Sequence, residues 1–151
     1  MKLVYDLTNA QIATLHSLYQ KEWWTKGRSL EETQSCVSGS SLCVGLVDDD
    51  ENLVGFSRVL TDYTFKALIF DVIVSSNHRG SGLGERLLRA IFDHKKLYKV
   101  KNFELYCAPE MEKYYQKFGF STDVGGVLFL RKTRTSLVAK NFEDKIDDGS
   151  S

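Results

Sequence analysis

The chain has 151 residues, of which 42% are hydrophobic and 26% are charged, which is ordinary for a globular protein and enough for one domain with a real core. Twenty basic residues balance twenty acidic residues, so no overall positive charge would attract nucleic acid or an anionic membrane. No apolar run approaches the roughly 20 residues of a membrane span, and the N-terminus lacks the layout of a signal peptide, so we expect a cytoplasmic protein without membrane or nucleic-acid partners.

The first part of the chain predicts a short strand followed by two capped helices. Residues 2–6 form the predicted strand. Thr8 and Gln11 then fit a capping box, and apolar residues recur beyond it at helical spacing. Ser29 and Glu32 fit a second capping box, which opens a shorter helix.

The middle of the chain predicts a hairpin and a buried strand. Apolar residues 42–47 and 53–60 flank an acidic turn, which is the arrangement of two antiparallel strands. Residues 67–74 are apolar apart from Asp71, and a short apolar run of this kind is typical of a buried strand.

The remaining elements complete an alternating pattern. We expect a helix over residues 83–94, a strand over 103–107, a short helix over 110–117 and a final strand over 127–132. The resulting order, β-α-α-β-β-β-α-β-α-β, predicts an α/β protein with a mixed sheet and helices on its faces.

No repeat or low-complexity linker divides the chain. We therefore assign residues 1–134 to one domain and residues 135–151 to a polar, flexible tail. Cys36, Cys43 and Cys107 have neither metal-ligand spacing nor a CxxC pair. The three histidines are scattered, so we predict reduced thiols and no metal site.

The segment between the buried strand and the following helix predicts a phosphate-binding loop. Gly80, Gly82 and Gly84 stand at alternate positions and leave backbone N–H groups free of Cβ interference. These groups precede a helix, whose unpaired donors and dipole favour an anion, and Arg79 adds a cation. A nucleotide P-loop would need Gly-Lys-Ser/Thr here, and Glu85 stands where a dinucleotide fingerprint needs glycine.

Two motifs resemble those of the GNAT superfamily of acetyl-CoA-dependent N-acetyltransferases. Arg79, Gly82 and Gly84 match its Arg/Gln-x-x-Gly-x-Gly/Ala loop in full, and residues 114–120, Tyr-Tyr-Gln-Lys-Phe-Gly-Phe, resemble its second signature. The resemblance covers residues 3 to about 132. It implies the GNAT (acyl-CoA N-acyltransferase) fold, in which a mixed central sheet has splayed fourth and fifth strands and flanking helices.

The resemblance implies acetyl-CoA as co-substrate and no metal. The loop amides would hold the pyrophosphate of coenzyme A, and the preceding strand would pair with the pantetheine arm by strand addition. The implied cofactor-binding residues are Val72, Ile73, Val74, Arg79, Gly80, Ser81, Gly82, Leu83, Gly84 and Glu85.

The expected reaction is attack by an amine on the thioester in a ternary complex. The amine, with a pKa near ~10, must first lose a proton, and the departing thiolate gains from a proton donor. The resemblance implies that Tyr115 is this donor; the alternatives are that it only packs or only hydrogen-bonds the coenzyme sulfur. Asp71 is a candidate base with a raised pKa, a binder of the substrate ammonium, or a structural acceptor. Glu104, Asp62 and a water chain are alternative proton acceptors.

Specificity is expected in the first two helices and in the loop after the third strand. Trp24, Asp62 and Tyr63 are the predicted substrate residues, because aromatics and a carboxylate suit an amine with an apolar body. Trp23 continues the helical repeat and is expected in the core. The acceptor stays open between small-molecule and peptide amines, and a homodimer is an expected form of the family. The alternative function is a non-catalytic acyl-CoA-binding or protein-interaction domain of the same fold.

Overall fold

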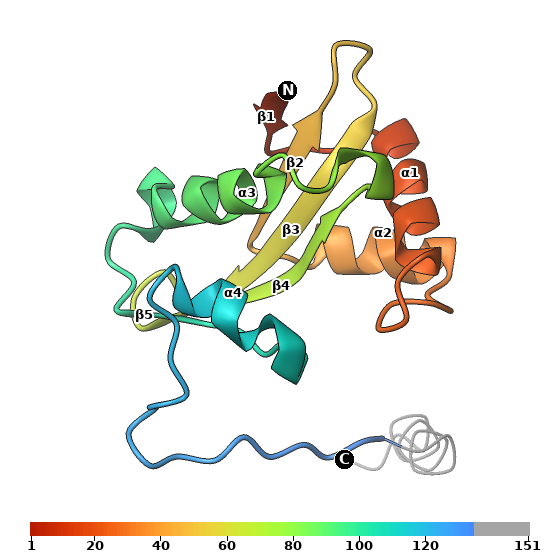
Figure 1. The fold of residues 1–151 in the computed structure, drawn as a ribbon. Coiled ribbons are helices and arrows are strands. Elements are labelled where there is room, and N and C mark those ends of the chain that lie inside the picture. Colours follow the sequence, from red (N-terminus) through yellow and green to blue (C-terminus); the bar gives the residue numbers. More distant parts are fainter. Residues whose placement is uncertain (135–151) are drawn as a thin grey trace, which may run out of the picture. The chain divides into compact units, whose positions relative to one another are not determined.

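The computed structural model describes residues 1–134 and divides into two compact units (Figure 1). The first unit, Met1–Pro109, holds the sheet, and the second begins at Glu110. The expected tail, 135–151, lies outside the described residues. Within the part that is described, no helix is both long and apolar enough to cross a membrane.

A five-stranded sheet forms the centre of the first unit, and its strands lie in the order in which the chain forms them. Neighbouring strands are antiparallel except for the last pair, which is parallel, so the predicted mixed sheet and the hairpin over 42–60 are confirmed. The strands are β1 (Lys2–Val4), β2 (Leu42–Val47), β3 (Leu53–Thr61), β4 (Lys66–Val74) and β5 (Asn102–Glu104).

Three helices of the first unit flank this sheet. Both predicted capping boxes are present, with Thr8 and Gln11 at the start of the first helix and Ser29 and Glu32 at the start of the second. Each box satisfies helix-end N–H groups locally, which explains why these helices begin where the sequence predicts. The helices are α1 (Asn9–Gln20), α2 (Leu30–Ser38) and α3 (Leu83–Phe92).

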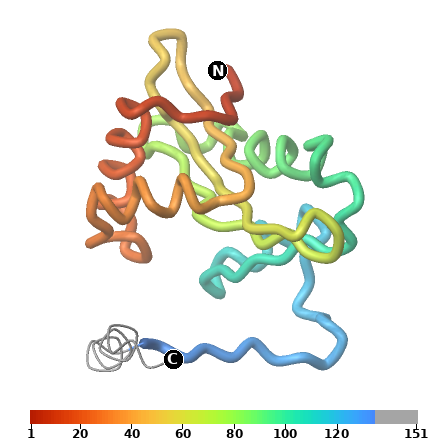
Figure 2. The backbone as a smooth tube through the Cα atoms, turned by 180° about the vertical axis from the view of Figure 1, so that it is seen from behind, coloured from red at the N-terminus to blue at the C-terminus, as the bar shows by residue number. Residues whose placement is uncertain are grey.

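The helices lie on opposite faces of the sheet (Figures 1 and 2). On β3, Phe56 belongs to the same buried cluster as Tyr19 of α1. The neighbouring Gly55 faces α3 instead, because a Cβ built on it would lie 3.4 Å from Leu87. Successive residues of a strand point to opposite faces, so α1 and α3 cover different sides.

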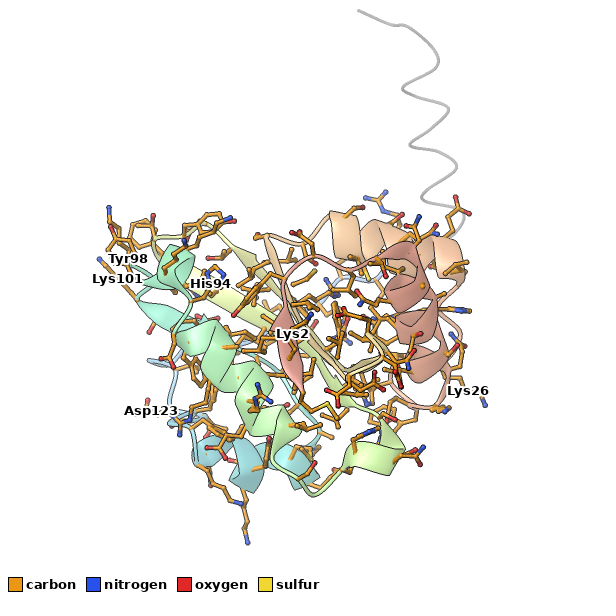
Figure 3. All side chains as sticks on the ribbon, turned by 90° about the horizontal axis from the view of Figure 1, so that it is seen from above. Lys2, Lys26, His94, Tyr98, Lys101 and Asp123 are labelled. Atoms are coloured by element: carbon orange, nitrogen blue, oxygen red, sulfur yellow. The ribbon has the colours of Figure 1, made fainter. Side chains whose placement is uncertain are left out.

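The segment after α1 corrects one expectation. Trp23 lies beyond the end of the helix and is 76% exposed, so it is not a core residue. The helical repeat stops because the buried Thr25 turns the chain back and donates its hydroxyl to the Tyr19 carbonyl at 2.8 Å. Figure 3 shows Lys26 of this segment and His94, which follows α3, on opposite sides of the first unit.

Strands β4 and β5 are hydrogen-bonded over only their first three residues. Their parallel pairing covers only Lys66–Leu68 and Asn102–Glu104. This short ladder matches the splayed fourth and fifth strands of the predicted fold, and β5 is shorter than the strand expected over 103–107. Beyond Leu68, the edge of β4 that faced β5 is left without a ladder partner among the described residues.

A β-bulge interrupts β4 on its other side. Phe56 pairs with Ile73 and Arg58 pairs with Phe70, so one residue of β3 faces two residues of β4. The bulge places Asp71 in the left-handed region at φ 57°, which Asp and Asn tolerate better than most residues. Bulges of this kind re-aim a side chain, and here the carboxylate is turned toward α1.

The second unit contains one α-helix among its described residues. A 3₁₀ turn at Pro109–Met111 precedes α4 (Glu112–Gln116), within the range predicted for a short helix. The prediction of a strand over 127–132 is wrong, because residues up to 134 form no strand after β5. The run Val127–Leu130 has strand-like composition, but its side chains are 66–85% exposed and it forms no strand within the described residues.

A buried carboxylate, that of Asp71, joins three segments of the first unit. Its Oδ2 accepts hydrogen bonds from Tyr19 Oη at 2.8 Å, Arg28 Nη1 at 2.8 Å and Arg58 Nε at 2.7 Å. Its Oδ1 accepts a longer bond from Arg28 Nη2 at 3.3 Å. The side chain is 4% exposed, so α1, the segment before α2, and β3 all meet at one desolvated negative charge.

This arrangement corrects the expected raised pKa of Asp71. Burial acts to raise the pKa, but the hydrogen bonds and positive charges of Arg28 and Arg58 outweigh it and hold the pKa below its ordinary value. Burial also raises the pKa of the Tyr19 hydroxyl, and the Asp71 charge raises it further, so Tyr19 stays a donor. The Asp71 carboxylate is therefore an acceptor held among three donor side chains, and the raised pKa expected of it is not found.

We expect Asp71→Asn to lower the free energy of unfolding at pH 7 by about 3–5 kcal/mol, because two partly buried guanidinium groups lose their counter-charge. Asn tolerates the positive φ at this position, so the change isolates the charge. The native pKa is depressed, so the stabilisation is present above the unfolded pKa near ~3.9 and is lost as pH falls through the native pKa. Urea denaturation at pH 7 and at progressively lower pH measures the free energy of unfolding of both proteins. The difference between variant and wild type should shrink below about pH 4.

Glu104→Gln provides the control. Glu104 pairs with Lys66 at 2.7 Å, but both side chains are more than a third exposed, so the loss should stay below about 1 kcal/mol. Equal losses in the two variants would contradict the role assigned to Asp71.

Candidate functional site

The glycine loop, residues 79–84, adopts a backbone that only glycine accepts easily at two points. It follows a 3₁₀ turn at Ser76–His78 and runs into the first two residues of α3. Gly80 has φ 81° and Gly82 has φ 78°, both in the left-handed region that disfavours a Cβ. A Cβ at either position would meet no atom within 4 Å, so the loop presents its backbone to open space.

The start of α3 is a site where an anion would be stabilised. Gly82 is its N-cap and no side chain caps the helix, so the first N–H groups, those of Leu83, Gly84 and Glu85, keep their capacity to bind a ligand. Ser81 turns its hydroxyl back to the His78 carbonyl, at 2.6 Å. The helix dipole adds partial positive charge at this end. The geometry predicted for the loop is therefore present.

Arg79 folds back over the end of β4. Its Nε donates to the Val74 carbonyl at 3.3 Å, and its guanidinium forms an ion pair with Glu22, which follows α1. The Arg79 side chain is 56% exposed and that of Glu22 is 18% exposed, so the pair lies at the surface with the carboxylate more sheltered. The sequence analysis did not predict Glu22 as a site residue. The only feature that could have indicated it is its position beside two tryptophans.

The strand that precedes the loop offers backbone groups along one edge. Ile73 and Val74 pair with β3 on one side. On the other side, Val72, Ile73 and Val74 lie beyond the end of the short ladder with β5, so this edge has no ladder partner in the described part of the chain. Such an edge can accept an extended ligand that carries amide groups.

The predicted substrate residues Asp62 and Tyr63 lie in the turn between β3 and β4, at the opposite end of β4 from the glycine loop. The Asp62 carboxylate accepts the N–H groups of Thr64, Phe65 and Lys66 at 2.9, 2.7 and 3.2 Å, and the first of these bonds contributes most to lowering its pKa. Asp62 thus organises the turn, and the Tyr63 hydroxyl donates to a backbone carbonyl at 3.2 Å.

Trp24 lies in the segment between α1 and α2, where its side chain is 39% exposed and can line a site. Trp24, Asp62 and Tyr63 remain predicted substrate residues. Of the predicted proton acceptors, each carboxylate already has partners: Asp71 in the buried cluster, Asp62 in its turn and Glu104 in its ion pair with Lys66.

Tyr115 belongs to the second unit. It lies on α4 with its ring edge-on to Tyr114 at 5.1 Å and to Phe120 at 6.0 Å between centroids. Its carbonyl accepts the N–H of Phe120 at 3.4 Å, which closes the turn after the helix. The second signature thus forms one small aromatic cluster, and the role of Tyr115 as an acid stays a prediction. Within residues 1–134, no group of three or more His, Cys, Asp or Glu side chains could hold a metal ion.

Known proteins with similar sequences and folds identify the family. The profile of the acetyltransferase (GNAT) family matches residues 8–120. An N-acetyltransferase named ycf52 from Pyropia yezoensis is 29% identical over 122 residues, which is 79% of this chain and 70% of that protein. The GCN5-related N-acetyltransferase 2 of Arabidopsis thaliana, named chloroplastic, is 30% identical over 132 residues, 84% of this chain and 45% of its own length.

A solved structure agrees with the sequence matches. The crystal structure of a GNAT-family protein from Xanthomonas campestris pv. campestris superposes with a TM-score of 0.75 at 26% identity, covering 92% of this chain and 98% of the other. Both the predicted family and the predicted fold are thereby confirmed. With the glycine loop formed at the start of α3 and the family profile spanning most of the chain, this protein belongs to the GNAT family of acetyltransferases.

Proposed function

We propose that the protein is an N-acetyltransferase that moves an acetyl group from acetyl-CoA to a primary amine by direct attack in a ternary complex. The observation that carries the proposal is the glycine loop, whose open backbone leads into an uncapped helix N-terminus. Family membership supports the reaction class.

The residues present fit coenzyme A. The backbone N–H groups of the loop and of the first turn of α3 suit a pyrophosphate, because Gly80 and Gly82 leave space where any other residue would place a Cβ. The free edge of β4 at Val72, Ile73 and Val74 suits the amide-bearing pantetheine arm. The residues proposed to hold the coenzyme are Val72, Ile73, Val74, Arg79, Gly80, Ser81, Gly82, Leu83, Gly84 and Glu85.

Acetyl-CoA would supply a thioester, whose carbonyl carbon bonds to the amine nitrogen while the carbon–sulfur bond breaks. We assign to Tyr115 the donation of a proton to the departing sulfur, because the family resemblance implies this role and a phenol hydroxyl can donate a proton to a thiolate. Asp71 is set aside as the base, since its carboxylate accepts hydrogen bonds from three side chains and its pKa is lowered. The proton of the amine is therefore proposed to leave through water.

The names of relatives support an amine as the acceptor, but they differ in which amine is acetylated. A rice relative, 31% identical over 81 residues, is named serotonin N-acetyltransferase 2, chloroplastic. A soybean relative, 23% identical over 129 residues, is named histone acetyltransferase TAP1. The cytoplasmic location expected from the sequence stays a prediction, because the rice relative and the Arabidopsis relative described above are named chloroplastic.

Thermal unfolding tests the coenzyme. At a concentration of acetyl-CoA one hundred times its Kd, binding adds about 2.7 kcal/mol, which should raise Tm by about 5–10 °C for a chain of this size. ATP and NAD should give no rise. Gly82→Ala should weaken binding by about 10-fold and roughly halve the rise, because it forces a Cβ and positive-φ strain into the loop.

Gly27→Ala is the matched control for Gly82→Ala. Gly27 has φ 98° and an equally open Cβ direction, but it lies outside the loop. It should lose similar stability and keep the full response to acetyl-CoA. No response in the wild type would remove the basis of the proposal.

Tyr115→Phe tests the acid. We expect kcat with the best amine found in a screen to fall about 100-fold, within the range for general acid catalysis, while the Tm rise with acetyl-CoA is unchanged. Tyr114→Phe, on the same helix, should keep near wild-type kcat. An unchanged kcat in Tyr115→Phe would exclude the acid role, and coenzyme binding without turnover of any amine would favour the non-catalytic acyl-CoA-binding alternative.

A further inference from the structure

A concave site apart from the glycine loop lies in the first unit, between α2 and β3. It is a pocket of about 580 Å³, within the range of roughly 300–1,000 Å³ typical of small-molecule sites. We call it the arginine pocket. None of its lining residues belongs to the glycine loop; they are Arg28, Glu31, Glu32, Ser35, Cys36 and Arg58.

Arg58 supplies a fixed cation to this pocket. Its Nε donates to Asp71 at 2.7 Å, and its guanidinium stacks over the Phe70 ring at 4.8 Å from the centroid. The side chain is only 14% exposed. Among the described residues only its Nε donates a hydrogen bond, which leaves the two terminal nitrogens, each with two N–H donors, open to water or a ligand. A planar fork that is held in place and partly desolvated is suited to a carboxylate or phosphate.

Arg28 supplies a second cation from the other wall. It donates hydrogen bonds to both carboxylate oxygens of Asp71, and its Cζ lies 4.5 Å from the centroid of the Tyr19 ring. Its carbonyl also accepts a hydrogen bond from Gln20 at 2.7 Å, which fixes the backbone there. The two guanidinium groups are thus preorganised before any ligand arrives, which reduces the entropy lost on binding.

The charges of the pocket limit which anion it could hold. Two guanidinium groups share one buried carboxylate, so the floor carries one uncompensated positive charge. Glu31 and Glu32 line the same pocket, and Glu32 directs its carboxylate to the Ser29 N–H at 2.9 Å. Counted with these two carboxylates, the formal charge of the pocket and Asp71 is negative, so a doubly charged phosphate is disfavoured and a carboxylate would be held by the local donors of Arg58 and Arg28 rather than by net charge.

The arginine pocket lies within reach of the proposed acetyl-transfer site. Arg58 pairs with Phe70 across the β3–β4 ladder, and Val72 follows Phe70 by two residues. At about 3.3 Å per strand residue, this is a separation of at most roughly 7 Å along β4, because the bulge at Asp71 shortens the path. An amine the size of an amino acid can therefore span the distance between the pocket and the backbone proposed to hold the pantetheine arm.

We propose that the arginine pocket binds a carboxylate of the acceptor, so that the substrate is a small amine that also carries a carboxylate, such as an amino acid or a short peptide. The inference rests on the proposed acetyltransferase function and narrows its substrate class. Arg58 and Arg28 would bind the carboxylate through charge-assisted hydrogen bonds, and neither takes part in the proton transfers.

The test is a matched acceptor series with the wild-type protein and acetyl-CoA. Glycine, 3-aminopropanoate and 4-aminobutanoate vary the distance between amine and carboxylate, and each is compared with its methyl ester and with the alkylamine of equal length. O-phosphoethanolamine represents the phosphate-bearing amines. At the best length, the carboxylate form should exceed its ester and alkylamine in kcat/KM by about 10-fold or more, the effect of a charged hydrogen-bonded partner.

Arg58→Lys shows whether the pocket causes this preference. Lysine keeps a positive charge for Asp71 but loses the planar fork, so the kcat/KM ratio of carboxylate to ester should fall about 10-fold, mainly through KM. Arg89→Lys is the control, since Arg89 is exposed on α3 and pairs with Glu85, and it should leave the ratio unchanged. If Arg58→Lys does not fold, Arg28→Lys serves in its place, because Arg28 is the more exposed of the two.

The outcomes separate this inference from the proposed function. Turnover of alkylamines or esters as well as or better than the carboxylates would overturn the inference and leave the acetyltransferase intact. A preference for O-phosphoethanolamine would also overturn it, in favour of a phosphate site. A carboxylate preference that survives Arg58→Lys would place recognition elsewhere. Absence of both an acetyl-CoA response and turnover of any amine would refute the proposed function and this inference together.

Discussion

The buried carboxylate of Asp71 is the interaction on which the first unit depends. Burying a charge is unfavourable unless it is paired and hydrogen-bonded, and here one side chain receives donors from Tyr19, Arg28 and Arg58. These donors come from α1, from the segment before α2 and from β3. The same carboxylate therefore fixes the helical layer to the sheet and holds both guanidinium groups of the arginine pocket in place.

The β-bulge is what makes that interaction geometrically available. An unbroken ladder would keep β4 in regular alternation, whereas the extra residue turns Asp71 into the left-handed region and toward α1. After the bulge, β4 runs directly into the turn and the glycine loop. The path of the strand thus links the ionic cluster on one face of the sheet to the helix end that we propose binds the coenzyme.

The sequence predicted most elements of the first unit because their signals are local. The two capping boxes and the acidic turn between apolar runs each lie within a short window. Apolar spacing alone was a weaker guide: Trp23 is exposed because α1 ends at Gln20 and Thr25 turns the chain back, and the apolar run at 127–132 forms no strand within the described residues.

The same distinction holds for the site. The glycine loop was predictable because spacing within six residues defines it, and the structure forms it as expected. Asp71 was recognised as unusual, but the direction of its pKa shift depends on two arginines that lie 43 and 13 positions away in the chain. Glu22, Arg28 and Arg58 carried no motif, and only the folded chain brings them to Arg79 and Asp71.

The order of the strands has a consequence for how the chain reaches this structure. Strands β2, β3 and β4 are consecutive antiparallel neighbours joined by short turns, so their contacts close small loops and cost little chain entropy. The β4–β5 pair needs a crossover through α3 and is only a few residues long. Because folding speeds up when contacts are local in sequence, we expect the three-strand meander to form early. The short β4–β5 ladder, beyond which the edge proposed to hold the coenzyme is free, would then form last and have little effect on the folding rate.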